Sequence, residues 1–185
     1  MQHQTGWDIG YPSTPLKEFI DQLGNKSISI LIPGCGNSYE AEYLLRSGFN
    51  NLTLIDIAPS LTRELEKKFY FYLDKQLTII TGNFFELNKQ YDLILEQTFF
   101  CALDPSLRLK YVQKMYEILK PGGKLVGVLF DKAFDGGPPF GGSREEYMKL
   151  FKEYFSIETM EPCYNSIPPR AGTELFIKIK KVAAQ

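Results

Sequence analysis

Two glycines and an aspartate in the first third of the chain follow a pattern typical of adenosine-binding proteins. Gly34 and Gly36 follow an apolar run, and Asp56 ends the next apolar run, twenty positions after Gly36. Glycine permits positive φ and lets the backbone approach a ligand closely. A carboxylate at the end of the second strand can accept both hydroxyls of a ribose. The pattern predicts a nucleoside ligand, against the alternative of a capping turn and a surface aspartate.

Tyr39 narrows the choice of nucleoside ligand. It stands where the dinucleotide motif G-x-G-x-x-G has its third glycine, which allows close helix packing beside a bound pyrophosphate. A tyrosine there favours a ligand without a pyrophosphate, and S-adenosyl-methionine is such a ligand. Its amino-acid end can use the Gly34 carbonyl and nearby amides. A nicotinamide-dependent oxidoreductase is the alternative that Tyr39 disfavours.

The ends of the third and fourth predicted strands carry further candidates. Asn83 can hydrogen-bond the exocyclic amine of adenine, and either Phe84 or Phe85 can flank the ring. The alternative is that these phenylalanines belong to the core. Glu96 can face the ammonium of the ligand, and Phe99 can make a cation–π contact with a sulfonium. A packed aromatic turn is the alternative for that second segment.

Two segments outside the predicted strands carry aromatic residues able to close such a site. Trp7, the only tryptophan, lies before the first strand, and we expect residues 1–26 to form an N-terminal lid. The loop 133–143, rich in glycine and proline, follows the fifth strand at the same edge, so Phe134 or Phe140 can reach the pocket. Terminal packing and a plain connector are the respective alternatives.

Composition excludes several other kinds of chemistry. The only histidine is His3, which excludes histidine triads and most zinc hydrolysis. The three cysteines form no CxxC pair, so we expect reduced thiols, no metal site and a cytoplasmic location. A net charge of -1 without a basic stripe disfavours nucleic acid, and no run has the length of a membrane span. A small-molecule partner fits, with the chain a monomer or a weak dimer.

Apolar runs alternate with amphipathic stretches, as in βαβ units. We expect five parallel strands, at residues 27–32, 52–56, 77–81, 92–96 and 124–130. We expect four helices, at residues 39–47, 59–73, 105–119 and 144–154. Two last strands, at 156–161 and 174–180, have no helix between them and should pair as a hairpin. The 185 residues are therefore predicted to form one α/β domain with a Rossmann-like, doubly wound seven-stranded sheet that has one antiparallel strand.

Eight short motifs together resemble the thiopurine S-methyltransferase family, especially its branch of thiol, thiocyanate and halide methyltransferases. They are WDIG at 7–10, IPGCG at 32–36, LIDI at 54–57, GNFF at 82–85, YDLI at 91–94, FFCALDP at 99–105, LKPGG at 119–123 and GGPPF at 136–140. The resemblance runs from residue 7 to about residue 179. FFCAL and GGPPF are fairly specific to this family, whereas many methyltransferases share the others.

The resemblance implies a class I methyltransferase that uses S-adenosyl-methionine and releases S-adenosyl-homocysteine. It implies cofactor contacts for Trp7, Gly34, Cys35, Gly36, Asp56, Ile57, Asn83, Phe84, Phe85 and Glu96. It implies that Phe99, Phe134 and Pro138 lie near the acceptor. No residue is assigned a catalytic role.

Four positions depart from the family pattern. Asn83 and Glu96 stand where aspartates are usual, and Thr173 replaces an arginine of the final hairpin turn. Gln97 replaces an arginine of the thiopurine enzymes, which argues against a thiopurine substrate. These departures keep open the alternative of a module that binds the cofactor or its product without turnover.

A thiol, or thiocyanate or halide, is the acceptor that this residue set favours. Methyl transfer from a sulfonium is an in-line displacement, and the sequence offers no strong candidate for a base. Alkyl thiols have a pKa of about 8.5, so some thiolate exists near neutral pH without one. An oxygen or amine acceptor would more often need a base. The sequence therefore predicts an S-methyltransferase.

Overall fold

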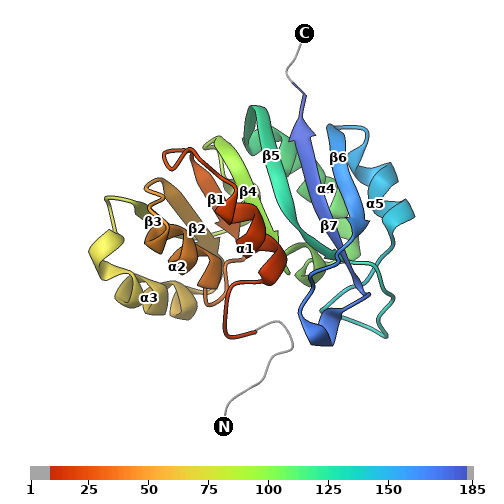
Figure 1. Cartoon of the computed structure of the whole chain (residues 1–185), viewed down its shortest axis with the longest axis horizontal. Coiled ribbons are helices and arrows are strands. Elements are labelled where there is room, and N and C mark those ends of the chain that lie inside the picture. The colour runs from red at the N-terminus through yellow and green to blue at the C-terminus, as the bar shows by residue number, and fades with distance from the viewer. Residues whose placement is uncertain (1–8, 183–185) are drawn as a thin grey trace.

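A single seven-stranded sheet runs through the protein, in a computed structural model that describes residues 9–182 (Figure 1). The strands are β1 (Ile30–Pro33), β2 (Leu52–Asp56), β3 (Leu77–Thr81), β4 (Tyr91–Gln97), β5 (Leu119–Phe130), β6 (Phe155–Pro162) and β7 (Glu174–Lys181). Their order is β3-β2-β1-β4-β5-β7-β6. Among the described strands, β7 alone runs opposite to the others and pairs antiparallel with both β5 and β6, as a hairpin without a crossover helix requires. The predicted doubly wound sheet with one antiparallel strand is confirmed.

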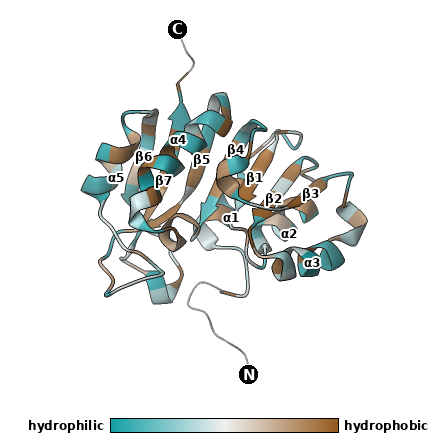
Figure 2. Ribbon diagram, turned by 180° about the vertical axis from the view of Figure 1, so that it is seen from behind, coloured by the Kyte–Doolittle hydropathy of each residue, from teal (hydrophilic) through white to brown (hydrophobic). Residues whose placement is uncertain are grey.

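Helices cover both faces of this sheet. They are α1 (Thr14–Asp21), α2 (Tyr39–Arg46), α3 (Pro59–Lys68), α4 (Arg108–Ile118) and α5 (Arg144–Phe151). The first three pack on one face and the last two on the other (Figure 1). Apolar residues concentrate in the strands, and polar residues on the outer sides of the helices (Figure 2). Among the described helices, none is long and apolar enough to cross a membrane.

The sequence prediction differs from the structure at several element ends. Helix α1 was not predicted, although its buried Leu16 and Ile20 have helical spacing and a proline in the first turn is a typical start signal. The helix expected at 59–73 ends at Lys68, and a 3-10 turn follows at Tyr70–Tyr72. Strand β5 begins at Leu119, and a register shift against β4 accommodates the glycines before Lys124.

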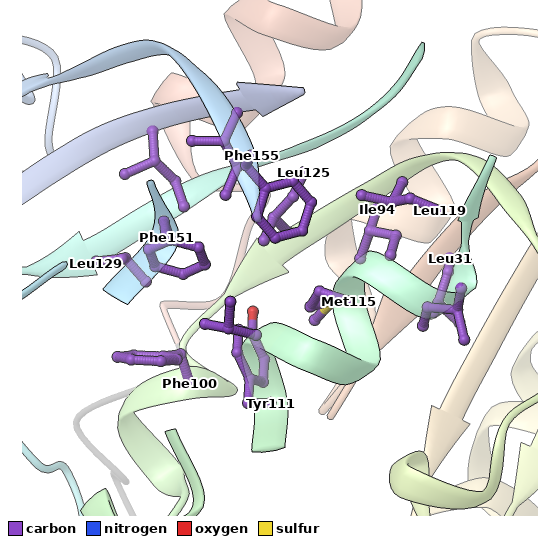
Figure 3. Close-up of a cluster of buried hydrophobic side chains, with 14 of the residues drawn as sticks. Leu31, Ile94, Phe100, Tyr111, Met115, Leu119, Leu125, Leu129, Phe151 and Phe155 are labelled. Carbon is purple, nitrogen blue, oxygen red and sulfur yellow. The ribbon is translucent and has the colours of Figure 1, made fainter. Parts of the chain in front are cut away.

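The larger core cluster lies between α4, α5 and the sheet (Figure 3). Tyr111 and Met115 of α4 are fully buried there. Phe100, from the turn after β4, packs edge-on against the ring of Tyr111 at 5.0 Å between centroids. Aromatic pairs of this kind contribute beyond the area that they bury. One side of the turn after β4 therefore packs into the core.

A buried carboxylate fixes this turn. Glu96 has no exposed surface, and its Oε1 accepts hydrogen bonds from the backbone N–H groups of Phe99 at 2.8 Å and Phe100 at 2.9 Å. Its Oε2 accepts the Tyr111 hydroxyl at 2.6 Å. Gly127 of β5 lies opposite Glu96, and a Cβ at Gly127 would overlap the glutamate. Burial raises the pKa of Glu96 to about 7, although all three hydrogen bonds act in the opposite direction.

The Glu96→Gln variant should change how stability depends on pH. Because the pKa of Glu96 is raised in the folded state, its protonated form stabilises the fold below about pH 4.5, and this contribution is lost as pH rises through about 7. A shift of this size corresponds to about 3 kcal/mol. Glutamine keeps the acceptor oxygen and does not titrate. We expect the free energy of unfolding of the wild type, measured in urea, to fall relative to that of Glu96→Gln as pH rises from about 4.5 to about 7.

The exposed Glu66 of α3 provides the control, because Glu66→Gln removes a carboxylate that is not buried. Its stability difference from the wild type should stay constant over the same range. A Glu96→Gln difference that is also constant, or that changes in the wild type's favour as pH rises, would contradict the raised pKa.

Candidate functional site

A cavity of about 730 Å³ opens at the carboxyl edge of the sheet. The turns after β1, β2, β3 and β4 all contribute to its wall, together with residues of the N-terminal segment. Backbone hydrogen bonds extend the sheet into two of these turns, from Gly34 N–H to the Ile55 carbonyl and from Gly82 N–H to the Asp56 carbonyl, each at 2.9 Å. The volume is within the usual range for a small-molecule site.

The glycine turn after β1 forms one side of the cavity. Gly34 and Gly36 have φ of +55° and +48°, in the left-handed region that glycine adopts without strain. A Cβ at Gly34 would overlap the ring of Phe99, whereas a Cβ at Gly36 would meet open space. Position 34 therefore requires glycine for two reasons: the positive φ of its backbone, and the Phe99 ring that occupies the space of a side chain. The cavity is lined by both glycines and by Phe99.

Cys35, between the two glycines, also lines the cavity. Its side chain is buried, and burial raises the pKa of the thiol to about 11. Burial likewise raises the pKa of Cys101 to about 12. Both thiols are therefore protonated at neutral pH and are poor nucleophiles. Their role in the structure is that of small core residues.

Asp56 lines the cavity at the end of β2. Its Oδ1 accepts a hydrogen bond from the Ala58 N–H at 3.0 Å, which orients the carboxylate just before α3 begins. An ionised carboxylate has about four acceptor positions, so it can take further donors from a ligand. Ile57 beside it is 75% exposed at the rim, where an apolar side chain can cover a flat ring.

Asn83 caps the short 3-10 turn Phe84–Glu86. Its Oδ1 accepts the Phe85 N–H at 3.0 Å, and its Nδ2 donates to Glu86 at 3.2 Å, which fixes the orientation of the amide. The carbonyl oxygen keeps a second acceptor position. Phe84 is buried in the core and Phe85 is partly exposed, yet both contribute to the cavity wall. Phe84 is thus a core residue that also forms part of the cavity wall.

The expected contact of Glu96 with the ligand is not supported. Glu96 is fully buried beneath the turn, hydrogen-bonded to Phe99, Phe100 and Tyr111, and does not line the cavity. Its neighbour Gln97 lines the cavity instead. The Oε1 of Gln97 is buried and has no hydrogen-bond partner among residues 9–182. Buried acceptors without a partner are rare, so this oxygen marks a position for a donor from a ligand.

Phe134 and Pro138 also lie elsewhere than expected. Neither lines the cavity; the Phe134 ring packs edge-on against Phe130 at 5.0 Å, and Pro138 is exposed. The loop does approach the site, because the Phe140 N–H donates to the Cys101 carbonyl at 2.7 Å. The other predicted closing residue, Trp7, lies outside the described residues.

Sequence reasoning missed several residues of the cavity wall. These are Ile9, Tyr11, Glu40, Leu103 and Leu107, among others. Leu103 lies in the FFCAL motif, so that motif contained a signal for it. Nothing in the sequence marks Glu40, a buried acid in a helix.

Comparisons with known proteins agree with this geometry. Residues 1–175 match the family described as thiopurine S-methyltransferase. The chain is 31% identical to "Probable thiol methyltransferase 2" of Arabidopsis thaliana and 29% identical to "Thiocyanate methyltransferase 1" of Brassica oleracea. Each alignment covers 96% of this chain and 80% of the relative.

A solved glycopeptide N-methyltransferase, complexed with S-adenosyl-homocysteine, has a similar fold. Its TM-score is 0.74 at 14% identity, over 94% of this chain and 91% of that one. This similarity concerns the fold alone, which is that of class I S-adenosyl-methionine-dependent methyltransferases. Because its sequence matches the family along most of its length, the chain belongs to the thiopurine S-methyltransferase family.

Proposed function

We propose that the cavity binds S-adenosyl-methionine and that the enzyme transfers its methyl group to a small, soft nucleophile, foremost a thiolate. Thiocyanate and halides belong to the same acceptor class. Family membership supports methyl transfer over nicotinamide chemistry. The observation that carries the choice of acceptor is that the described residues of the cavity wall include no candidate base.

The residues present fit the cofactor. Asp56 has acceptor positions for ribose hydroxyls, and the glycine turn offers close backbone approach. The buried Gln97 oxygen lacks a donor within the described part of the chain, and the ammonium or a hydroxyl of the cofactor would supply one. When bound, S-adenosyl-methionine supplies an electrophilic methyl carbon on a sulfonium.

The part of the wall formed by the turn after β4 is mainly apolar. Phe99, Ala102, Leu103 and Leu107 contribute there. Among the described lining residues the only charged ones are Glu40 and Asp56, and no lysine, arginine or histidine takes part. An apolar surrounding favours a step in which a cationic donor and an anionic acceptor lose their charges together.

Neither carboxylate of the wall is positioned as a base for the acceptor. Asp56 is oriented by the Ala58 N–H at the ribose position, and Glu40 accepts the Ser13 N–H at 2.9 Å. Glu96, whose raised pKa would suit a base, is enclosed behind Phe99. The residues of this chain therefore orient the reactants and exclude water, and positioning alone can contribute several kcal/mol.

The free cysteines and the charge of the cavity support a proposal for the location and partners of the enzyme. The three cysteines are all free, as is typical of the cytoplasm, where we propose that the enzyme acts. A cavity with acidic charges offers no phosphate contacts, so we propose a small-molecule partner rather than nucleic acid. We propose a monomer or weak dimer.

The rate of methyl transfer should follow the ionisation of the acceptor. With a simple alkyl thiol, kcat/KM should rise about tenfold per pH unit up to the thiol pKa of about 8.5 and then level off. With iodide or thiocyanate, which are ionised throughout, it should be nearly flat from pH 6 to 9. Transfer of a radiolabelled methyl group measures both profiles.

Faster methylation of a phenol or an amine than of any thiol would refute the choice of acceptor. Binding of S-adenosyl-homocysteine without product from any acceptor would instead support the alternative of a non-catalytic binding module.

Replacement of Asp56 should weaken the cofactor site. Hydrogen bonds to a charged group contribute about 1.5–3 kcal/mol, so Asp56→Ala should raise the Kd for S-adenosyl-homocysteine roughly 10- to 100-fold in calorimetry. The matched control is Asp74→Asn in the exposed turn before β3, where φ is +56° and asparagine is tolerated. An Asp56→Ala Kd within twofold of the wild type would exclude the ribose contact.

A further inference from the structure

A buried glutamate in the first turn of α2 faces both the cavity and the N-terminal segment. Glu40 is 6% exposed and contributes to the cavity wall. Its Oε1 accepts a hydrogen bond from the backbone N–H of Ser13 at 2.9 Å, across 27 positions of sequence. Ser13 is itself buried and precedes α1 as its N-cap. The methyl-transfer chemistry described above gives Glu40 no role.

The charge of Arg170 stabilises the ionised form of Glu40. Burial raises the pKa of Glu40, whereas the hydrogen bond from Ser13 and the positive charge of Arg170 act in the opposite direction. Arg170 is buried and is paired with Glu174 at the start of β7, at 3.3 Å between Nη1 and Oε1. The side chain of Glu40 therefore accepts a buried hydrogen bond from the N-terminal segment, and the positive charge of Arg170 favours its ionised form. This hydrogen bond makes Glu40 a fixed point for the chain at Ser13.

This fixed point lies next to the segment that closes the cavity. Ile9 and Tyr11, just before Ser13, contribute to the cavity wall. The four residue-to-residue steps from position 9 to position 13 can span at most about 14 Å, so the anchor at Ser13 limits where both side chains can lie. The glycine turn after β1 leads directly into α2, whose first turn contains Glu40. The proposed cofactor contacts and the anchor of the covering segment are therefore close together in the sequence.

We propose that Glu40 is a positioning residue that holds residues 9–13 over the cavity through the Ser13 N–H, and so strengthens cofactor binding without taking part in methyl transfer. This inference rests on the proposed function, because it assigns the covering segment to the cofactor. It requires the carboxylate oxygen as an acceptor and the Ser13 N–H as a donor. It does not require the Ser13 hydroxyl, which is buried without a partner among the described residues.

Two substitutions at Ser13 separate the hydrogen bond from other effects without altering Glu40. Ser13 has φ of -60°, a value that proline adopts, so Ser13→Pro removes the N–H at a compatible backbone angle. Ser13→Ala keeps the N–H and removes only the hydroxyl. We expect the Kd for S-adenosyl-homocysteine to rise about tenfold in Ser13→Pro and to stay within twofold of the wild type in Ser13→Ala.

Substitutions of the acceptor complete the test. Glu40→Ala removes the acceptor and should also raise the Kd about tenfold, whereas Glu40→Gln keeps an acceptor oxygen and should stay within threefold. Glu42→Gln in the same helix is the control, because Glu42 pairs with Arg46 and Lys68 at the surface. The kcat at saturating donor should stay within threefold in every variant, so the change appears in the donor KM.

Hydrogen exchange of the free protein tests the anchor independently of the ligand. The amides of residues 9–11 should exchange faster in Ser13→Pro and Glu40→Ala than in the wild type and Ser13→Ala. Equal exchange in all four proteins, or equal weakening of binding by Ser13→Ala and Ser13→Pro, would overturn the positioning role. If the wild type bound no S-adenosyl-homocysteine, the proposed function would fail, while the exchange comparison would still decide whether Glu40 orders the segment.

Discussion

The contact between the turn after β1 and the turn after β4 is the constraint on which the site depends. β1 and β4 are paired in the sheet, so their following turns must share the space at its carboxyl edge. The ring of Phe99 fills the position that a side chain at residue 34 would need, and Gly34 is the residue that allows it. Glu96 holds the Phe99 and Phe100 amides from below. A nucleoside-sized cavity exists because these turns are fixed against each other.

Much of this arrangement could be predicted from the sequence, because the positions of the strands and of their ends are set by local sequence patterns. A strand, a glycine turn, a helix and a strand ending in Asp56 predict the carboxyl-edge site, and the structure has them there. Glu96 could not be placed in the same way. From Leu93 onward, alternate residues of β4 face opposite sides, and Ile94 packs in the cluster of α4 whereas Leu95 packs in that of α1 and α2. Glu96 shares the side of Ile94 and meets Tyr111.

The alternation also explains why the sequence did not indicate Gln97 as a residue of the cavity wall. A residue shift of one along a strand moves a side chain to the other face, so the family position alone does not say which of two adjacent polar residues meets the ligand. Long-range partners decide the remaining cases. Ser13 binds Glu40, and the Phe140 N–H binds the Cys101 carbonyl, through contacts that no local pattern encodes. These are the parts of the site that required the three-dimensional structure.

The three carboxylates around the site have different roles because their surroundings differ. Asp56 stays at the wall with acceptor positions for a ligand, Glu40 is bound to the N-terminal segment, and Glu96 is enclosed in the core. Glu96 does not reach the cavity, and one oxygen of Glu40 is engaged by the Ser13 N–H. The fold thus uses two of its acids to hold parts of the cavity in place, and leaves Asp56 at the cavity wall. Chemistry in such a cavity depends on acceptors that arrive already nucleophilic, and soft sulfur anions meet that requirement.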